Sequence, residues 1–289
     1  MIVRALPCWR GAIRVAPLTG GLSNASFRVE DDAGVHVARI GRDFPFHHVF
    51  RDREAAASRW AHQAGLAPEV RYHAPGVMVT AFIDGQTLDA VGVRARIAPI
   101  ADLLQRVHLE LRDLARGPAA IFWPFHVARD YCERLRLAGH DIGPELPRFE
   151  RLAAELEARQ TPMPTVFGHH DLLPGNLIDD GKRLWLIDWE YAAFGSPMFD
   201  LANLADNAGF TPDEERDLLT RYFGRAPNAD TERAFAAMKV GSALREALWA
   251  MVSELRLAAP GVDYAAYAAT CLQRFEAAHA AYRESARQP

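Results

Sequence analysis

The hydrophobic positions of the chain follow two different periods, one in each part. Over about the first eighty residues they alternate with polar positions, as in strands that bury one face. The alternating segments are 12–17, 25–30, 35–40 and 76–82, with glycine-containing turns between them. This pattern predicts a small antiparallel sheet. A helical period interrupts it over 51–64, and Gly65 marks the end of that helix.

After about residue 84 the hydrophobic positions recur at helical spacing. The expected helices are 94–115, 124–138, 147–159, 197–207, 213–223, 230–257 and 263–284. One segment departs from this period, because 176–178 and 184–187 flank a turn that contains Gly181, which predicts a β-hairpin. The chain therefore predicts an α+β fold with two lobes: residues 1–83 form a β-rich lobe, and residues 84–289 form a mainly helical lobe that carries the hairpin.

The last long helix before the carboxyl end shows a periodic stripe. Leu244, Leu248, Met251 and Leu255 are spaced four, three and four apart, which predicts the buried side of the helix. Trp249 lies about 100° away from this stripe, next to Arg245. The spacing leaves two roles open for Trp249: packing against a neighbouring helix, or facing a bound molecule.

Composition excludes several classes of protein. The chain has 289 residues, of which 49% are hydrophobic and 24% charged, which is typical of a soluble globular protein. Its net charge is 33 − 37 = −4, so no basic excess favours nucleic acid, and we expect a small-molecule partner. No apolar run approaches the roughly 20 residues of a membrane span. Three cysteines without CxxC spacing predict reduced thiols in the cytoplasm. The oligomeric state stays open, with a homodimer among the alternatives.

The segment 167–190 collects the groups that phosphoryl transfer needs. His169 and Asp171 form an H-x-D pattern, Asn176 follows five residues after the aspartate, and Asp188 follows twelve residues after Asn176. In kinase-like enzymes this spacing makes Asp171 the catalytic carboxylate and Asn176 with Asp188 the Mg²⁺ ligands. We group His169 with Asp171 as catalytic. The alternatives are ordinary turn residues, or a zinc site at His169 and His170, which would point to opposite faces of an extended chain.

A nucleotide kinase also needs a cation for the phosphates. The two lysines lie in the second half of the chain, so Arg39 on the third strand is the candidate, with Glu54 on the helix as its partner. A solvated strand residue and a solvated helix residue are the alternative. The loop over the phosphates would be 18–27, an ordinary hairpin being equally open. Its candidate phosphate contacts are Gly20, Gly21, Ser23 and Asn24.

These segments together resemble the choline/ethanolamine kinase family, which lies within a wider group that contains aminoglycoside phosphotransferases and has the protein-kinase fold. The resembling segments cover roughly residues 17–210: "GGLSNASFRV", "VARIG", "REAAA", "GLAPEVRY", "VMVTAFIDGQTL", "GHHDLLPGN" and "LWLIDWEYAAFGSPMFDLANL". The resemblance implies ATP and Mg²⁺ as cofactors, Asp171 as base, and Arg39 where protein kinases carry lysine. It also implies that Thr80 to Ile83, with Phe82 between them, is the hinge that hydrogen-bonds adenine.

A quaternary ammonium acceptor would need aromatic faces and nearby carboxylates. Glu190 and Tyr191 match acceptor-site positions of the family, and we add Trp249 and Asp206 as candidate contacts. Two positions depart from the choline kinase pattern: Glu246 stands where a second tryptophan is usual, and Asn207 stands where a glutamate is usual.

The leading hypothesis is an ATP-dependent kinase for the hydroxyl of a small amino alcohol, choline or ethanolamine first. Another acceptor in the same fold, such as an aminoglycoside, thiamine or a sugar, stays open. A noncatalytic nucleotide-binding pseudokinase is the alternative from a different class. A protein kinase is disfavoured, because "IDWE" replaces the DFG motif and no APE segment follows.

Overall fold

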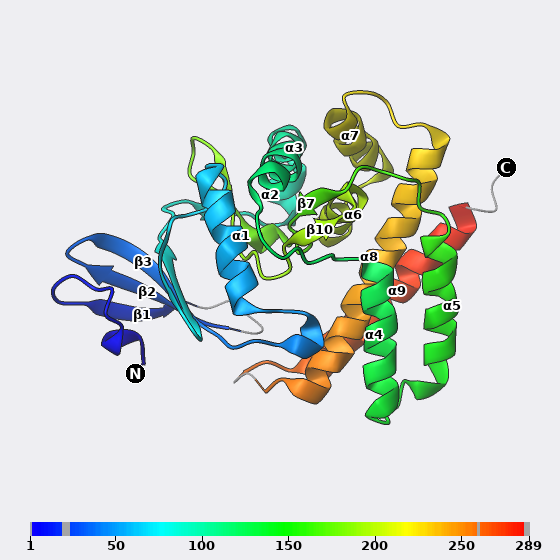
Figure 1. Ribbon diagram of the computed structural model, residues 1–289. Helices are drawn as coiled ribbons and strands as arrows, with labels where there is room; N and C mark the ends of the chain where they lie inside the picture. Colours follow the sequence, from blue (N-terminus) through cyan, green and yellow to red (C-terminus); the bar gives the residue numbers. More distant parts are fainter. Residues whose placement is uncertain (1, 19–23, 259–260, 286–289) are drawn as a thin grey trace.

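The computed structural model describes residues 2–18, 24–258 and 261–285. The amino-terminal strands β1 to β3 lie at one end of the molecule and most of the helices at the other (Figure 1). The amino-terminal sheet has five antiparallel strands in the order β1-β2-β3-β5-β4. They are β1 Arg14–Leu18, β2 Ala25–Asp31, β3 Gly34–Ile40, β4 Val70–Ala74 and β5 Val77–Ala81, preceded by the 3₁₀ turn Ile2–Ala5. The sequence predicts all of them except β4, whose half-buried residues give no clear alternation.

One helix interrupts the strands of the amino-terminal part, as predicted. Helix α1, Arg51–Gln63, follows the 3₁₀ turn Pro45–His47 and connects β3 to β4. Half of its buried residues are alanines, Ala55, Ala57 and Ala61, which let the backbone approach its neighbours closely. Gly65 follows with a φ of +72°, a conformation that glycine adopts readily, and so ends the helical run.

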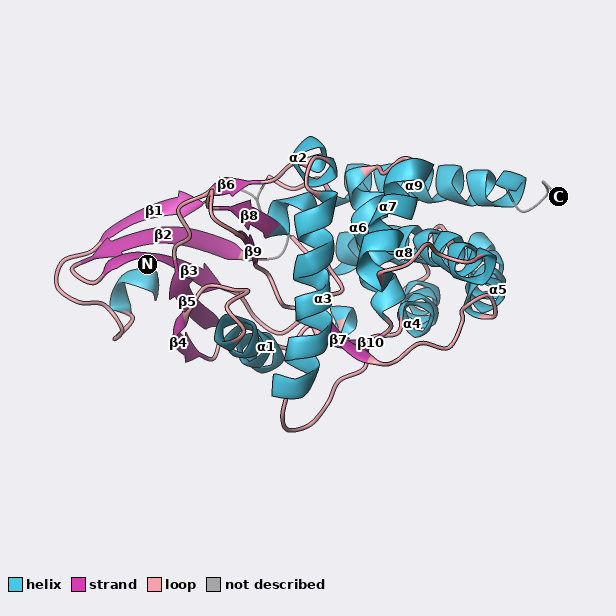
Figure 2. Ribbon diagram, turned by 90° about the horizontal axis from the view of Figure 1, so that it is seen from above, coloured by secondary structure: helices cyan, strands magenta, loops and turns pink. Residues whose placement is uncertain are grey.

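The carboxyl-terminal part is mainly helical, and the fold class expected from the sequence is confirmed. Figure 2 shows its helices massed on the side away from the sheet. They are α2 Ala90–Arg94, α3 Ile97–Leu114, α4 Pro124–Leu137, α5 Leu146–Glu157, α6 Pro197–Ala208, α7 Pro212–Phe223, α8 Ala229–Arg256 and α9 Tyr264–Ser285, with a 3₁₀ turn at Gly143–Glu145. The expected helix 94–115 starts later, at Ile97, because the chain turns at Ala95 and Arg96 after α2.

Helix α8 is covered on several sides, since α4, α5, α6 and α9 all pack against it. The expected stripe is right at Leu244, Leu248 and Met251 and wrong at Leu255, which is 40% exposed near the end of the helix. Arg245, one position after the stripe begins, is only 1% exposed. A helix surrounded by others buries polar positions as well as apolar ones.

The predicted hairpin is present, and one shorter strand extends it. It consists of β8 Leu177–Asp179 and β9 Leu184–Leu186, and β6 Gln86–Thr87 pairs with β8. Asn176 lies just before it, in the 3₁₀ turn Pro174–Asn176. Nearby, β7 Val166–Gly168 pairs with β10 Ala193–Gly195. The sequence does not predict β6, β7 and β10, because two or three residues show no period.

The large hydrophobic core crosses the boundary between the two parts, and the sheet has a smaller cluster of its own. A small cluster that includes Val29, Ala38 and Val79 lies in the sheet, whereas α1 belongs to the large core formed by the helices. The backbone N–H of Leu186 donates to the carbonyl of Leu66 across 2.9 Å. Because β6 already pairs with the hairpin, we propose that the lobes join in the segment between β5 and β6. No helix of the described chain is long and apolar enough to cross a membrane.

Candidate active site

A cavity of about 560 Å³ opens between the sheet and the hairpin. Its walls carry residues of both lobes that the sequence singles out for nucleotide and metal binding: Asn24, Arg39, Thr80, Phe82, Ile83, Asn176 and Asp188. The structure therefore brings together groups from the first loop, the third strand, the junction segment and the hairpin. Gly20, Gly21 and Ser23 lie outside the described residues.

Arg39 bridges the two lobes at the wall of this cavity. Its guanidinium forms an ion pair with Glu54, and its Nη1 donates to Asp188 Oδ1 across 2.5 Å. Burial alone would raise the pKa of Asp188, but the charge of Arg39 holds it below its usual range. Arg39 and Glu54 thus meet as the sequence predicts, and neither is a solvated surface residue.

Glu190 lies close enough to Arg39 to feel its charge. Its Oε2 accepts hydrogen bonds from Arg51 Nη1 across 2.8 Å and from Asn24 Nδ2 across 3.2 Å. Arg51 also donates to Glu54 across 2.6 Å. Burial, and then the nearby Asp188 carboxylate, raise the pKa of Glu190. Sequence reasoning misses Arg51, although its place three residues before Glu54 at the start of a helix is the available signal.

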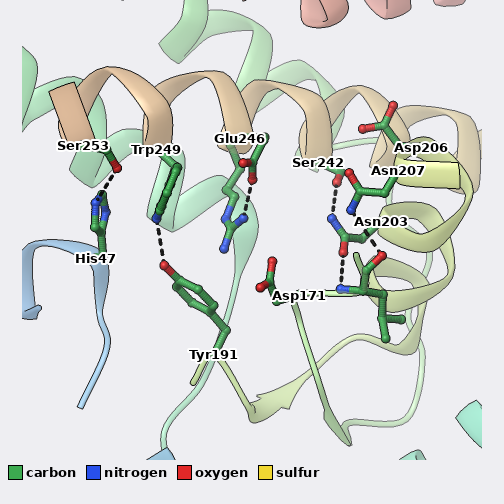
Figure 3. A network of polar contacts seen from close by, with 12 residues as sticks. His47, Asp171, Tyr191, Asn203, Asp206, Asn207, Ser242, Glu246, Trp249 and Ser253 are labelled. Carbon is green, nitrogen blue, oxygen red and sulfur yellow. Dashed lines mark hydrogen bonds and ion pairs between the residues drawn. The ribbon is translucent and has the colours of Figure 1, made fainter. Parts of the chain in front are cut away.

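Asp171 and Asn176 lie on one loop that is tied to the hairpin. Asn176 Nδ2 donates to the carbonyl of Asp171 across 2.8 Å, and its own carbonyl accepts from the N–H of Ile187 across 2.9 Å. The carboxyl group of Asp171 points towards α8 (Figure 3). Burial raises the pKa of Asp171 well above its usual range, and the positive charge of Arg245 acts against that rise. The carboxylate therefore lies in a setting where it takes up a proton readily.

The ring of His169 contacts the backbone of Asp171 and that of Ile187. Its Nε2 lies 2.9 Å from the carbonyl of Ile187, and its Nδ1 accepts from the backbone N–H of Asp171 across 3.3 Å. The ring is fully buried, and burial lowers its pKa, so it is neutral. Both ring nitrogens are occupied by the backbone. We therefore propose that His169 is a positioning residue for Asp171 rather than a residue that touches the substrate.

A buried carboxylate that sequence reasoning misses anchors this loop. Asp200, near the start of α6, accepts from the backbone N–H groups of His169 across 2.8 Å and His170 across 2.7 Å, and it contacts His108 Nε2 at 2.9 Å. Burial alone would raise the pKa of Asp200, but the hydrogen bond with His108 and the neighbouring histidines hold it far below its usual range. His170 has a φ of +63°, so the anchor holds a bend that this residue rarely adopts. The available signal is a lone charge in the apolar start of the expected helix 197–207.

On the other side of Asp171, two candidate acceptor contacts come together. Trp249 Nε1 donates to the hydroxyl of Tyr191 across 2.8 Å (Figure 3). Asp206 lies apart from this pair, beyond Asn203 in the same view, and contacts Arg274 at 3.4 Å. Burial raises the pKa of Asp206. Glu190, expected beside Tyr191 and Trp249, instead accepts hydrogen bonds from Arg51 and Asn24.

The departure from the choline kinase pattern at Asn207 has a local structural role. Asn207 Nδ2 donates to the carbonyl of Leu172 across 3.3 Å, and Asn203 Oδ1 accepts from the N–H of Leu172 across 2.7 Å. Asn203 Nδ2 in turn donates to Ser242 Oγ on α8 across 3.0 Å. These amides fix the backbone that follows Asp171 to α6 and α8.

The family model of the phosphotransferase enzyme family matches residues 14–239. The chain belongs to this family. A choline/ethanolamine kinase family protein from Mesorhizobium loti is similar at 29% identity, with a TM-score of 0.72 over 95% of this chain and 91% of that one. A probable ethanolamine kinase from Arabidopsis thaliana is 26% identical over 88% of this chain and 76% of its own length. A crystal structure of LicA in complex with AMP shares the fold at 24% identity, with a TM-score of 0.74 over 97% and 96% of the chains. The chain is a phosphotransferase of the kinase type.

The donor set of this phosphotransferase fits a hard divalent cation. Asp188 offers a carboxylate, and Asn176 offers its amide oxygen, because its amide nitrogen is occupied by the Asp171 carbonyl. Both line the cavity. Oxygen donors of this kind suit Mg²⁺, which takes its remaining ligands from phosphates and water.

The junction segment fits the adenine end of a nucleotide. The N–H of Phe82 is taken by the carbonyl of Val35 across 3.1 Å. In the part of the chain that the structure describes, the N–H of Ile83 has no hydrogen-bond partner, and Ile83 lines the cavity. A free backbone donor at this place is what an adenine nitrogen requires.

Proposed function

We propose that this phosphotransferase transfers the γ-phosphoryl group of ATP to the hydroxyl of a small amino alcohol. The observation that carries the proposal is the arrangement around one loop. Arg39, Asn176 and Asp188 line the cavity between the lobes. Asp171, five residues before Asn176, is not among the residues that line it, and its carboxyl group points towards α8 (Figure 3). Nucleotide and acceptor thus have separate places on the two sides of one fixed turn.

The nucleotide end uses the cavity. Its volume of about 560 Å³ is in the range of small-molecule sites, and the AMP bound by the relative LicA supports a nucleotide as the occupant. The free N–H of Ile83 would bind adenine, and Arg39 would neutralise phosphate charge. Asn176 and Asp188 would hold Mg²⁺, which when bound neutralises charge on the phosphate oxygens.

At the acceptor end, Asp171 orients the hydroxyl and receives its proton. The acceptor oxygen forms a bond to the γ-phosphorus while the bond from that phosphorus to the ADP oxygen breaks. The raised pKa of Asp171 suits this role, because a base works best with a pKa near the operating pH. The side chains of His169 and Asn176 bind the backbone of Asp171, and Asp200 binds the backbone N–H of His169. The main contribution of these residues to catalysis is therefore to position the Asp171 carboxylate against the acceptor hydroxyl.

An amino group on the acceptor is supported by the charges that surround Asp171. The charges of Glu246, Asp188 and Glu190 each act to raise the pKa of Asp171, and the side chain of Glu246 is largely buried, with 16% exposed. A cationic acceptor reduces the repulsion among these carboxylates. The relatives that are named choline/ethanolamine kinase and ethanolamine kinase support the same class of acceptor.

We keep the cytoplasm as the proposed location. Cys8, Cys132 and Cys271 are all free thiols. Burial raises the pKa of Cys132 to about 12, so this thiol is inert. Free, unreactive thiols fit a reducing compartment.

The proposal is tested by following ADP release from purified protein with Mg²⁺-ATP and a panel of acceptors: ethanolamine, choline, thiamine and an aminoglycoside. We expect release that depends on an amino alcohol, and a phosphorylated product identified by mass spectrometry. The Asp171→Asn variant is the control for contaminating kinases. A preference for thiamine or the aminoglycoside would overturn the acceptor class. Nucleotide binding without acceptor-dependent release from any of them would indicate a pseudokinase.

A further inference from the structure

A buried guanidinium lies beside the acceptor side of the catalytic loop. Arg245 on α8 is 1% exposed, and its Nη1 donates to Glu246 Oε2 across 2.8 Å. Among the residues that the structure describes, its Nε and Nη2 are buried and have no hydrogen-bond partner. Leaving charged donors buried and unpaired is costly, so some other attraction must hold this side chain in place.

Aromatic rings supply that attraction. The Cζ atom of Arg245 lies 4.7 Å from the ring centroid of Tyr191 and 5.6 Å from that of Phe122. A cation within about 6 Å of a ring face is attracted by the ring electrons. Tyr191 and Phe122 are 6% and 5% exposed, so little of either ring is open to anything else. The aromatic faces near Asp171 already hold a cation, and the chain itself supplies it.

Trp249 is occupied in the same way. Its N–H is bound by the hydroxyl of Tyr191, its face stacks on His47 at 4.9 Å, and the ring of Tyr267 meets it edge-on at 6.1 Å. His47 is neutral, because burial lowers its pKa well below the usual range. With 7% of its surface exposed, Trp249 presents no open face to an acceptor. The two aromatic residues expected to enclose a substrate cation therefore contact protein groups instead.

The charge of Arg245 also reaches the place where the acceptor hydroxyl binds. It lowers the pKa of Asp171 against the stronger effect of burial. A second fixed cation at the same rings would meet this guanidinium at short range in a medium that screens charge poorly. A trimethylammonium group has no hydrogen bond to donate and depends on ring faces. A primary ammonium has three N–H donors and can bind oxygen acceptors instead.

We infer that Arg245 is a specificity-determining residue. It occupies, on Tyr191 and Phe122, the position that a quaternary ammonium would need, and the acceptor is therefore a primary or secondary amino alcohol. The inference rests on the proposed function and names the acceptor class within it. It also gives a reason for Glu246 at a position where choline kinases usually carry tryptophan: its carboxylate pairs with the guanidinium.

The first test is a methylation series. Ethanolamine, N-methylethanolamine, N,N-dimethylethanolamine and choline differ only in the methyl groups on nitrogen. For the wild-type enzyme, kcat/KM should be highest for ethanolamine and should fall as methyl groups are added. In Arg245→Ala, the ratio of kcat/KM for choline to that for ethanolamine should rise by about 30-fold, the value of one desolvated cation–π contact. An unchanged ratio contradicts the inference.

Two further variants separate charge from folding defects. Arg245→Met keeps most of the volume without the charge, so it should shift the ratio in the same direction even if Arg245→Ala fails to fold. Arg148→Ala is the matched control, because Arg148 lies over the rings of Phe149 and Phe275 in another part of the helical lobe. The acceptor ratio of this control should equal that of the wild type. If Arg148→Ala changes the ratio as much as Arg245→Ala, the effect is not specific and the inference fails.

The second test needs no turnover. Tetramethylammonium chloride should leave the melting temperature of the wild type unchanged relative to sodium chloride, and it should raise that of Arg245→Ala or Arg245→Met by filling the vacated ring faces. If the wild type phosphorylates no amino alcohol, the proposed function fails, and this binding difference alone decides the role of Arg245. Tetramethylammonium binding to the wild type, or to none of these proteins, overturns it.

Discussion

Arg39 Nη1 donates a hydrogen bond to Asp188 Oδ1 across 2.5 Å, although 149 positions separate the two residues. The same guanidinium is paired with Glu54. One side chain therefore joins the sheet, helix α1 and the end of the hairpin. Because Asp188 is also a proposed Mg²⁺ ligand, this contact connects the proposed phosphate-binding cation directly to the proposed metal site.

Replacing Arg39 by methionine should raise the KM for ATP by about 10- to 100-fold, which corresponds to the loss of a charge-assisted hydrogen bond of about 1.5–3 kcal/mol. The fold should survive, because Arg51 still pairs with Glu54. Arg14→Met removes an exposed strand arginine that pairs with Glu30 and is the matched control. Equal KM values for ATP in Arg39→Met and the control would remove Arg39 from the phosphate site.

Asp188→Ala and Asn176→Ala should both raise the Mg²⁺ concentration needed for half-maximal activity at saturating ATP. Asp188→Ala should have the larger effect, because it removes a full negative charge from the ion, whereas Asn176→Ala removes a dipole. Asp217→Ala, which removes an exposed aspartate from an ion pair on α7, should titrate as the wild type does. A Mg²⁺ titration that neither site variant changes would exclude both residues as ligands.

Asp200→Ala should cost about 3–5 kcal/mol of unfolding free energy, because it leaves a buried histidine and two backbone N–H groups without their shared acceptor. Urea unfolding provides the measurement. Asp217→Ala, an exposed residue in an ion pair, should change the free energy by no more than about 1 kcal/mol. A loss in Asp200→Ala no larger than that of the control would show that the anchor is not needed for stability.

The stability of the protein should fall in mild acid partly because of His170. Burial lowers its pKa from 6.5 to about 4. Below pH 6.5 the unfolded chain takes up a proton that the folded chain refuses, so stability falls until the pH reaches about 4. At about 1.4 kcal/mol per pH unit, this residue accounts for about 2 kcal/mol between pH 6.5 and 5.

His170→Asn should lose that much less unfolding free energy than the wild type when urea unfolding at pH 7.5 is compared with pH 5. Asparagine tolerates the positive φ of this position. His126→Asn, which removes an exposed histidine of α4, should keep the wild-type pH dependence. The same loss in His170→Asn as in the wild type would show that His170 is not held neutral.

The sequence predicts those parts of the fold and site whose signal is a pattern within one short segment of the chain. The alternation of β1, β2, β3 and β5, the periods of the long helices and the Gly181 turn each lie within one segment. The spacing of Asp171, Asn176 and Asp188 is equally local, because a tight turn and a hairpin hold all three. Strand β4 and the short strands β6, β7 and β10 leave no such pattern, since partners far along the chain determine them.

The residues that sequence reasoning misses owe their roles to distant partners. From the sequence, Asp200 is an ordinary residue of a helix. Its role follows from its contacts with His108, His169 and His170 in the folded chain. Arg245 would be solvated on a helix exposed on one side. It is buried because other helices cover α8 on several sides and because cation–π contacts with Tyr191 and Phe122 stabilise its charge. The hydrophobic periodicity of one helix gives no information about aromatic rings that other segments place against it.

The central claim is that Asp171 is the carboxylate that receives the acceptor proton, and Asp171→Asn tests it most directly. The substitution keeps the size of the side chain and leaves the backbone contacts to His169 and Asn176 in place. The measurement is kcat with the best amino alcohol, together with ATP affinity by calorimetry. We predict a loss of kcat of about 10²- to 10⁴-fold with unchanged ATP binding. A variant that retains more than about a tenth of the wild-type kcat would contradict the claim.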